Sequence, residues 1–154
     1  MFVGEYTGKL DNKGRIIFPS PLKRQIPTDK PVSFVIKSDI YEKCLNLYHT
    51  SEWDIQTKAL KKRLNLFNKQ HADFLREYYR GTAEIFLDTN NRILIPKRLL
   101  DYIDGGNELV FAAQGSKIEI WSKEKYENKQ PTNEEYADLA NNILGGEYGI
   151  FNEE

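Results

Sequence analysis

Two short motifs of the form Asp-x-x-x-Arg carry the clearest chemical signal in the sequence: Asp11 with Arg15, and Asp88 with Arg92. An arginine side chain can bond the O6 and N7 atoms of guanine together, and such pairs are the most common specific contacts in the DNA major groove. The aspartate four residues earlier can instead hold the arginine in a surface ion pair, which contributes under about 1 kcal/mol. The motifs therefore predict either a nucleic-acid contact or a solvated salt bridge.

Charge is unevenly distributed along the 154-residue chain, although the net charge is only -1. Residues 8–37 contain seven basic and two acidic residues, whereas residues 130–154 contain six acidic residues and no basic one. This asymmetry favours a basic working face and an acidic tail. We expect Arg15 to contact bases in double-stranded DNA. Its basic neighbours should contact phosphates, which position a protein without reading sequence; these neighbours are Lys9, Lys13, Lys23 and Arg24.

Arg92 is open to two interpretations. Fewer basic residues lie near it in the sequence, and Asp88, Asp101 and Asp104 are close. It could contact DNA, or it could bridge neighbouring subunits of an oligomer. Asp11 and Asp88 are expected to close turns and orient the arginines rather than to touch DNA, because a carboxylate repels phosphate.

The sequence predicts no catalytic, metal or cofactor site. Cys44 is the only cysteine and the two histidines, His49 and His71, are far apart, so an intramolecular disulfide is impossible and a metal site is not expected. Phosphate-binding loops and nucleophile motifs are missing, as are an apolar run of about 20 residues for a membrane span and a signal peptide. We therefore expect a cytoplasmic protein that is not an enzyme and has no small-molecule substrate.

An internal repeat places the two motifs in equivalent positions, 77 residues apart. Residues 10–22 and 87–99 share six identities in thirteen positions. Downstream, residues 32–36 match 109–113, and after a gap of four residues 45–48 match 118–121, with Trp53 opposite Tyr126. Self-similarity of this kind indicates a duplicated unit of about 45 residues.

Each unit is expected to place a tight turn between two strands. Asp11 and Asp88 can accept hydrogen bonds from backbone amides two residues further on. Gly14 permits a positive φ at no steric cost, and Asn91, at the equivalent position, is the next most tolerant residue. The β-branched residues after each arginine predict a strand that ends at a proline.

A short helix and two further strands complete the unit. In the second copy we expect a helix over about residues 97–102, ended by Gly105 and Gly106. Strands should follow at residues 109–113 and 117–121, because apolar and polar residues alternate in the latter.

The predicted organisation has four parts: a first repeat (5–54), a helical spacer (55–80), a second repeat (81–127) and an acidic C-terminal helix and tail (128–154). Ser51 is the predicted N-cap of the spacer, which is amphipathic and is expected to divide into two helices near residues 65–68. Its basic run is interpreted as a solvated helix face. The last helix is expected over residues 133–144, ended by Gly145 and Gly146.

The sequence resembles a known family in both motif regions. Gly4-Glu5-Tyr6 followed by residues 11–19 resembles the opening of the MraZ family, and residues 92–99 resemble the wider AbrB and SpoVT class of DNA-binding strands. The resemblance covers roughly residues 1–127. Asn91 departs from the glycine usual in the second motif, and Phe18 departs from the isoleucine more common before the proline.

The resemblance implies a mixed, mainly β fold: a swapped-hairpin, double-psi-like barrel built from the paired repeats. It also implies a ring of several subunits that binds short direct repeats in the promoter of the division and cell-wall gene cluster, including its own promoter. A near-neutral subunit should bind one site weakly, and linked modules gain affinity through effective concentration. We expect a nucleoid-associated repressor. The alternative is an antitoxin-like barrel whose acidic tail binds a partner protein.

Overall fold

A computed structural model describes residues 1–27 and 32–145, which fall in two compact units, Met1–Lys123 and Glu124–Glu154. Gly146 and the acidic tail beyond it lie outside the described residues. The strands are β1 (Glu5–Lys9), β2 (Arg15–Ile17), β3 (Ser33–Ser38), β4 (Leu45–His49), β5 (Ala83–Phe86), β6 (Arg92–Leu94), β7 (Glu108–Ala113) and β8 (Ile118–Ser122). The helices are α1 (Ser20–Lys23), α2 (Thr50–Lys62), α3 (Lys69–Tyr79), α4 (Lys97–Tyr102), α5 (Lys123–Asn128) and α6 (Asn133–Leu144).

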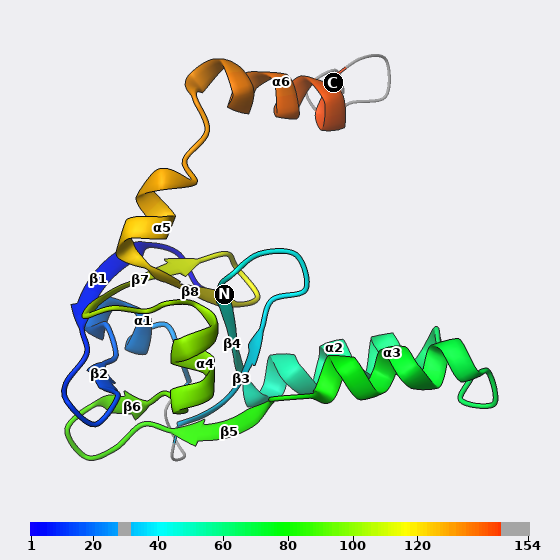
Figure 1. Cartoon of the computed structure of the whole chain (residues 1–154), viewed down its shortest axis with the longest axis horizontal. Helices are drawn as coiled ribbons and strands as arrows, with labels where there is room; N and C mark the ends of the chain where they lie inside the picture. Colours follow the sequence, from blue (N-terminus) through cyan, green and yellow to red (C-terminus); the bar gives the residue numbers. More distant parts are fainter. Residues whose placement is uncertain (28–31, 146–154) are drawn as a thin grey trace. The chain divides into compact units, whose positions relative to one another are not determined.

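The strands of the first unit form a six-stranded sheet and a two-stranded ribbon (Figure 1). The order in the sheet is β1-β7-β8-β4-β3-β5, and every neighbouring pair is antiparallel. The ribbon pairs β2 with β6, also antiparallel. Because β1 and β5 form the two edges of the sheet and continue through tight turns into β2 and β6, the ribbon closes the sheet into a barrel.

Each turn-forming hairpin pairs with the opposite repeat. The first-repeat strand β1 pairs with β7 of the second repeat, and β5 of the second repeat pairs with β3 of the first. The ribbon itself takes one strand from each repeat. This exchange confirms the mainly β, swapped-hairpin barrel that the family resemblance implies. It also means that residues close in sequence to one arginine can lie close in space to the other.

The core is built from matching positions of the two repeats. Ile16 and Ile93 are 1% and 0% exposed at the centre of the ribbon. Phe18 is also 1% exposed; its ring stacks on Phe34 at a centroid distance of 5.1 Å and meets Phe111 edge-on at 6.0 Å. Burial of such large side chains is the main term that favours folding. One shared core therefore holds both arginine-bearing strands in place.

Several predicted helix boundaries are confirmed and two caps are corrected. The spacer is divided, since α2 ends at Lys62 and α3 begins at Lys69. The N-cap of α2 is His49, whose ring accepts a hydrogen bond from the Ser51 amide, and not Ser51. After α4 the first left-handed residue is Asp104 (φ 48°) rather than a glycine, and Gly106 (φ 60°) is left-handed two residues later. The amide of Gly105, between them, donates a hydrogen bond to the carbonyl of Leu100 at 3.1 Å.

Two helices, α5 and α6, follow β8 along the chain. The helix α5 starts 73 residues after the start of α2, which is the same offset that relates β8 to β4. A helix at α5 was not predicted from the sequence, although Tyr126 matches Trp53 at this offset. The last helix, α6, spans the predicted residues and begins with a capping box, in which the Thr132 hydroxyl accepts from the Glu135 amide and the Glu135 carboxylate accepts from the Thr132 amide.

An aromatic cluster fixes the base of the α2–α3 hairpin to the outer face of the sheet. Trp53 of α2 stacks on Tyr78 of α3, with ring centroids 5.8 Å apart, and also contacts Tyr48 of β4 at 5.5 Å. Lys37 of β3 is 4% exposed, and its ammonium lies 3.6 Å from the centroid of the Tyr78 ring. Burial lowers the pKa of Lys37 to about 8, although the charge of Asp39 acts in the opposite direction.

Lys37→Met should therefore stabilise the protein at pH 7. The folded-state pKa of Lys37 is below its ordinary value of 10.5, so the cost of burying its charge is complete below pH 8 and disappears as the pH rises past 10.5. Allowing for the lost cation–π contact, we expect a gain of about 1–2 kcal/mol in the free energy of unfolding at pH 7. Urea unfolding at pH 7 and pH 10 measures this gain, which should shrink at pH 10. The exposed Lys62→Met is the control; equal effects of the two substitutions would contradict the prediction.

Candidate nucleic-acid interface

Asp11 closes the first turn through three hydrogen bonds. Its Oδ1 atom accepts from the backbone amides of Lys13 and Arg15, both at 2.9 Å. Its Oδ2 atom accepts from the Nε atom of Arg15 at 2.8 Å. The Arg15 amide contributes most to holding the pKa of Asp11 down, at about 2. The carboxylate therefore stays ionised at neutral pH and keeps the Arg15 side chain in place.

The second turn repeats this geometry closely. Asp88 Oδ1 accepts from the amides of Asn90 (2.8 Å) and Arg92 (2.9 Å), and Asp88 Oδ2 accepts from Arg92 Nε at 3.0 Å. The Arg92 amide is again the main reason that the pKa of Asp88 is lowered. Gly14 and Asn91 occupy the left-handed position of their turns, with φ of 81° and 59°. The predicted turn contacts are thus present in both copies, and Asn91 takes the role of the usual glycine.

The outer face of the ribbon carries both arginines together with two exposed apolar residues. Arg15 lies opposite Leu94 and Ile17 lies opposite Arg92 in the strand register. Ile17 and Leu94 are 64% and 55% exposed, although both belong to strands whose central residues are buried. Neither residue is among the site residues predicted from the sequence. Strand alternation could have done so, because the burial of Ile16 places its neighbours on the other face.

Both arginines keep hydrogen-bonding capacity outside their turns. Within the described part of the chain, the side-chain hydrogen bond of Arg15 uses only Nε, and the same holds for Arg92. A guanidinium has five N–H donors, so the two outer nitrogens of each side chain remain for a ligand. The salt bridge and the nucleic-acid contact are therefore compatible.

The helix of each repeat lies beside the turn of the other repeat. Lys23, at the end of α1, donates a hydrogen bond from Nζ to Oδ1 of Asn91 in the second turn. In the first turn, a Cβ added to Gly14 would meet Leu100 of α4 at 3.4 Å. Leu100 is the residue 77 positions after Lys23, so the two ends of the ribbon are related by the repeat.

This arrangement corrects the grouping of charges made from the sequence. Lys23 and Arg24 are expected beside Arg15, but they line a pocket with Asn90 and Asn91 at the second turn. Asp101, expected near Arg92, lines a pocket with Asp11 at the first turn. The physical reason is the exchange of hairpins, which brings each helix to the turn of the opposite repeat. Arg92 therefore has more basic surroundings than its sequence neighbours indicate.

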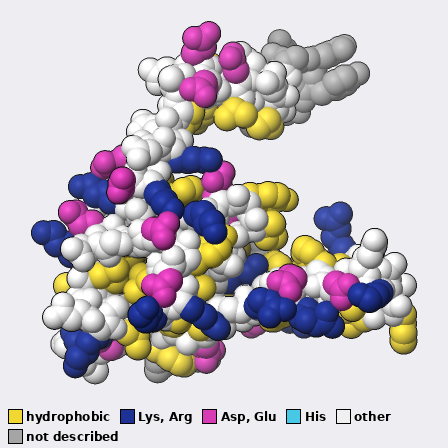
Figure 2. Space-filling model, viewed as in Figure 1, with side chains coloured by type: hydrophobic (Ala, Val, Ile, Leu, Met, Phe, Trp, Pro, Cys, Tyr) yellow, Lys and Arg dark blue, Asp and Glu magenta, His cyan; other side chains and the backbone are white. Residues whose placement is uncertain are grey.

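The remaining predicted basic residues stay near the first turn. Lys13 is exposed within the turn, and Lys9 is exposed at the end of β1, opposite Glu108 in the register. A further group of basic side chains lies along the α2–α3 hairpin (Figure 2). It includes Lys58, Lys61, Lys62 and Arg63, all exposed.

Gly14→Ala should destabilise the protein through the first turn. Alanine is strained at φ 81°, and its Cβ would lie 3.3 Å from the carbonyl oxygen of Ile95. We expect a loss of about 1–3 kcal/mol, since a left-handed residue costs about 1–2 kcal/mol and the close contact adds to it. Gly106→Ala is the matched control, because Gly106 has φ 60° with no atom within 4 Å of an added Cβ. Thermal unfolding of both variants measures the difference; an equal loss would show that the Ile95 contact contributes nothing.

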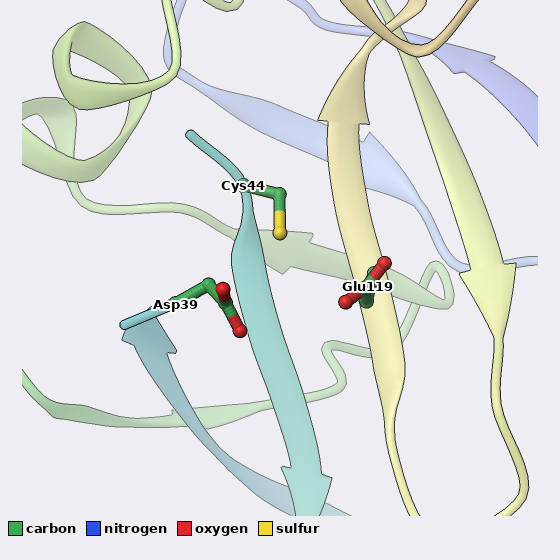
Figure 3. A group of neighbouring side chains, drawn as sticks. All are labelled: Asp39, Cys44 and Glu119. Atoms are coloured by element: carbon green, nitrogen blue, oxygen red, sulfur yellow. The ribbon is translucent and has the colours of Figure 1, made fainter. Parts of the chain in front are cut away.

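Asp39, Cys44 and Glu119 form a second cluster with potential ligand atoms (Figure 3). The ammonium of Lys117 already lies 3.7 Å from Asp39 and 3.4 Å from Glu119, and it donates to Asn46 Oδ1 at 3.1 Å. Burial raises the pKa of the Cys44 thiol, so it stays protonated and is a poor metal ligand. This donor set does not fit a metal ion; the lysine supplies the positive charge, and the cluster ties the β3–β4 connection to β8.

Comparisons with known proteins point in one direction. The family described as "MraZ protein, putative antitoxin-like" matches residues 1–77 and 78–142. A protein from Christiangramia forsetii named transcriptional regulator MraZ is 37% identical over 146 residues, covering 94% of each chain. Proteins with the same name from Flavobacterium psychrophilum (37%, covering 96% of this chain and 97% of that one) and Clostridium tetani (36%, 97% and 100%) are similar. Among the helices of residues 1–27 and 32–145, none has the length and apolar character needed to cross a bilayer.

Proposed function

Because the chain belongs to the MraZ family, whose relatives are named transcriptional regulators and not enzymes, we propose that it regulates transcription by binding double-stranded promoter DNA through the β2–β6 ribbon. The observation that carries this proposal is the pair of outward-facing arginines, each held through Nε by the aspartate of its own turn. A two-stranded ribbon fits the major groove. Arg15 and Arg92 would then bind guanine, and Ile17 and Leu94 would contact thymine methyl groups.

The surrounding basic residues support a role in phosphate binding. Lys9 and Lys13 lie at the first turn, and Lys23 and Arg24 lie at the second. Phosphate contacts fix the register of a protein on the duplex. Asp11, Gly14, Asp88 and Asn91 act indirectly, by shaping the turns that present the arginines.

Oligomerisation is part of the proposal. One near-neutral subunit offers few phosphate contacts, so a single complex should be weak. A ring of identical subunits raises the apparent affinity for tandem sites by effective concentration. Direct repeats about one helical turn apart present the same groove face to successive subunits. We propose that such a complex, at the nucleoid, represses the protein's own promoter and the division and cell-wall gene cluster.

A salt titration against the DNA upstream of the protein's own gene tests this function. Fluorescence anisotropy should show binding that is much tighter than to a scrambled duplex, and the affinity should fall linearly with the logarithm of salt concentration. Light scattering on the free protein and on the complex gives the number of subunits. Equal affinity for the upstream and scrambled duplexes would reject sequence-specific regulation.

A second candidate function is binding of a partner protein through α6. This helix exposes Tyr136, Leu139 and Ile143, which are 68%, 54% and 72% exposed and recur at helical spacing; Figure 2 shows hydrophobic side chains along one side of the helix. Its charged residues are all acidic, which favours a partner with a basic surface. Deleting residues 131–154 separates the two functions: loss of a co-purifying protein with DNA binding intact would favour this alternative.

A further inference from the structure

A local twofold axis relates the two ends of the β2–β6 ribbon, and the residues on its outer face follow this symmetry. The register pairs Ile16 with Ile93 at the centre, and Arg15 and Arg92 lie symmetrically on either side. B-DNA has twofold axes perpendicular to its length, so its backbone accepts a twofold-symmetric ribbon in either of two opposite orientations. The four outer residues of the ribbon are nearly equivalent in pairs. They give little basis for choosing one orientation over the other.

The helices beside the turns break this symmetry. At the second turn, which we call the α1 end, the flanking residues are Lys23 and Arg24. At the first turn, the α4 end, the residues at the same repeat positions are Leu100 and Asp101. Both pairs line pockets at the edge of the ribbon, where the phosphates that border the groove would pass.

The charge available to phosphates therefore differs between the two ends. At the α1 end Arg24 is exposed, and no described acidic side chain forms an ion pair with it or with Lys23. At the α4 end Lys97 is bound to Asp101 at 3.1 Å, and Asp104 lines the adjoining pocket with Asp101.

Two lysines at the α4 end reduce this difference but leave its sign. Lys9 lies opposite Glu108 in the β1–β7 register, but Glu108 is ion-paired with Lys123 at 3.6 Å, so Lys9 and Lys13 are both exposed cations at this end. Two carboxylates, Asp101 and Asp104, stand at the α4 end, whereas the same repeat positions at the α1 end hold Arg24 and Pro27, so the α1 end remains the more basic. Carboxylates placed next to DNA phosphates repel them, so the orientation that brings Asp101 and Asp104 against the phosphates is disfavoured.

We propose that this asymmetry fixes the orientation of each subunit on DNA, with Arg24 and Lys23 at the α1 end as the residues that set it. The inference rests on the proposed DNA-binding function and adds polarity to it. A subunit that binds in one orientation recognises an asymmetric DNA site. Successive subunits related by rotation in an assembly then require repeats in the same direction, and inverted repeats are bound less well.

Directed cleavage of DNA tests the orientation. Asn12 and Thr89 are exposed and occupy equivalent positions in the two turns. Asn12→Cys and Thr89→Cys would each carry an iron chelate that cuts nearby DNA, on a duplex with one centred copy of the selected site. The native Cys44 is 0% exposed and should not react with the chelate. The parent protein, treated in the same way, is the control. The two labels should cut on opposite sides of the site, each at least about tenfold more on its own side.

Charge exchange tests the cause of the orientation. Arg24→Asp combined with Asp101→Arg alters only exposed side chains, and it should lower the cleavage ratio to near one or reverse it. A retained ratio in this variant, with specific binding intact, would overturn the proposal. Symmetric cutting by the unexchanged protein would also overturn it while leaving the DNA-binding function standing. If the unexchanged protein formed no specific complex at all, the proposed function itself would be rejected.

A salt titration gives a second readout that does not depend on labels. Arg24→Gln should reduce the slope of log affinity against log salt by about 0.9, the value for one phosphate contact. Lys97→Gln is the matched control at the α4 end and should change the slope little, because its charge is already paired with Asp101. Equal changes in slope would contradict the assigned asymmetry.

Discussion

Arg15→Ala is expected to weaken binding to the specific duplex by about 1–3 kcal/mol, a loss of about 5- to 150-fold for each subunit contact, with the fold unchanged. This is the range for one bidentate arginine–guanine pair. The side chain is about one-third exposed and its packing is confined to the turn, so removal leaves the core intact. In an oligomer that holds several sites at once, the apparent loss should be larger, because each contact is weakened.

Arg92→Ala should give a loss of similar size. The Asp88–Arg92 pair has the same hydrogen bonds as the Asp11–Arg15 pair, and Arg92 occupies the equivalent place on the ribbon. Arg76→Ala is the matched control: Arg76 is an exposed arginine of α3 that is likewise bound to an aspartate, Asp73, at 3.0 Å. Anisotropy titrations of the three variants on one duplex make the comparison. Unaltered affinity in Arg15→Ala, or an equal loss in Arg76→Ala, would contradict the role of the ribbon.

The turns were predictable because their chemistry is local. An aspartate that bonds the amide two residues on, and a glycine or asparagine at a left-handed position, fix a tight turn within about five residues. Asp11 and Asp88 form these bonds as predicted. The internal repeat predicts that equivalent residues of the two turns have the same structural role. Ile16 and Ile93 are such a pair, and both are buried at the centre of the ribbon.

The charges around each arginine were not predictable from the chain alone, because they depend on exchange between the repeats. Lys23 follows Arg15 by eight residues yet bonds Asn91 in the other turn. Local sequence determines α1 and the turn separately, but only the pairing of β2 with β6 decides which helix faces which turn. The cap of α2 was missed for a related reason. A histidine ring can accept an amide hydrogen bond as a serine does, and the choice between His49 and Ser51 depends on where β4 ends.

Phe18→Ala should cause the largest loss of stability, about 3–5 kcal/mol in the free energy of unfolding. Phe18 is 1% exposed and packs between Phe34 and Phe111, so truncation leaves a cavity between the ribbon and the sheet. Urea unfolding at a fixed protein concentration, followed by the fluorescence of Trp53 and Trp121, measures the change. Phe18→Ile introduces the residue that stands at the equivalent position, Ile95, and should cost less than about 2 kcal/mol because much of the volume is retained.

The same pair of variants separates the stability of the barrel from the chemistry of its surface. Phe18 lies just after β2, and its amide bonds the carbonyl of Asn91 at 2.8 Å, which extends the ribbon by one step. Backbone hydrogen bonds survive side-chain truncation, so Phe18→Ala should retain its DNA affinity within about threefold at low temperature and without denaturant. The variant should stay folded under these conditions, because the total stability of such a domain is about 5–15 kcal/mol. A loss of DNA binding as large as that of Arg15→Ala, in a sample that circular dichroism shows to be folded, would mean that the core and not the arginines sets the affinity.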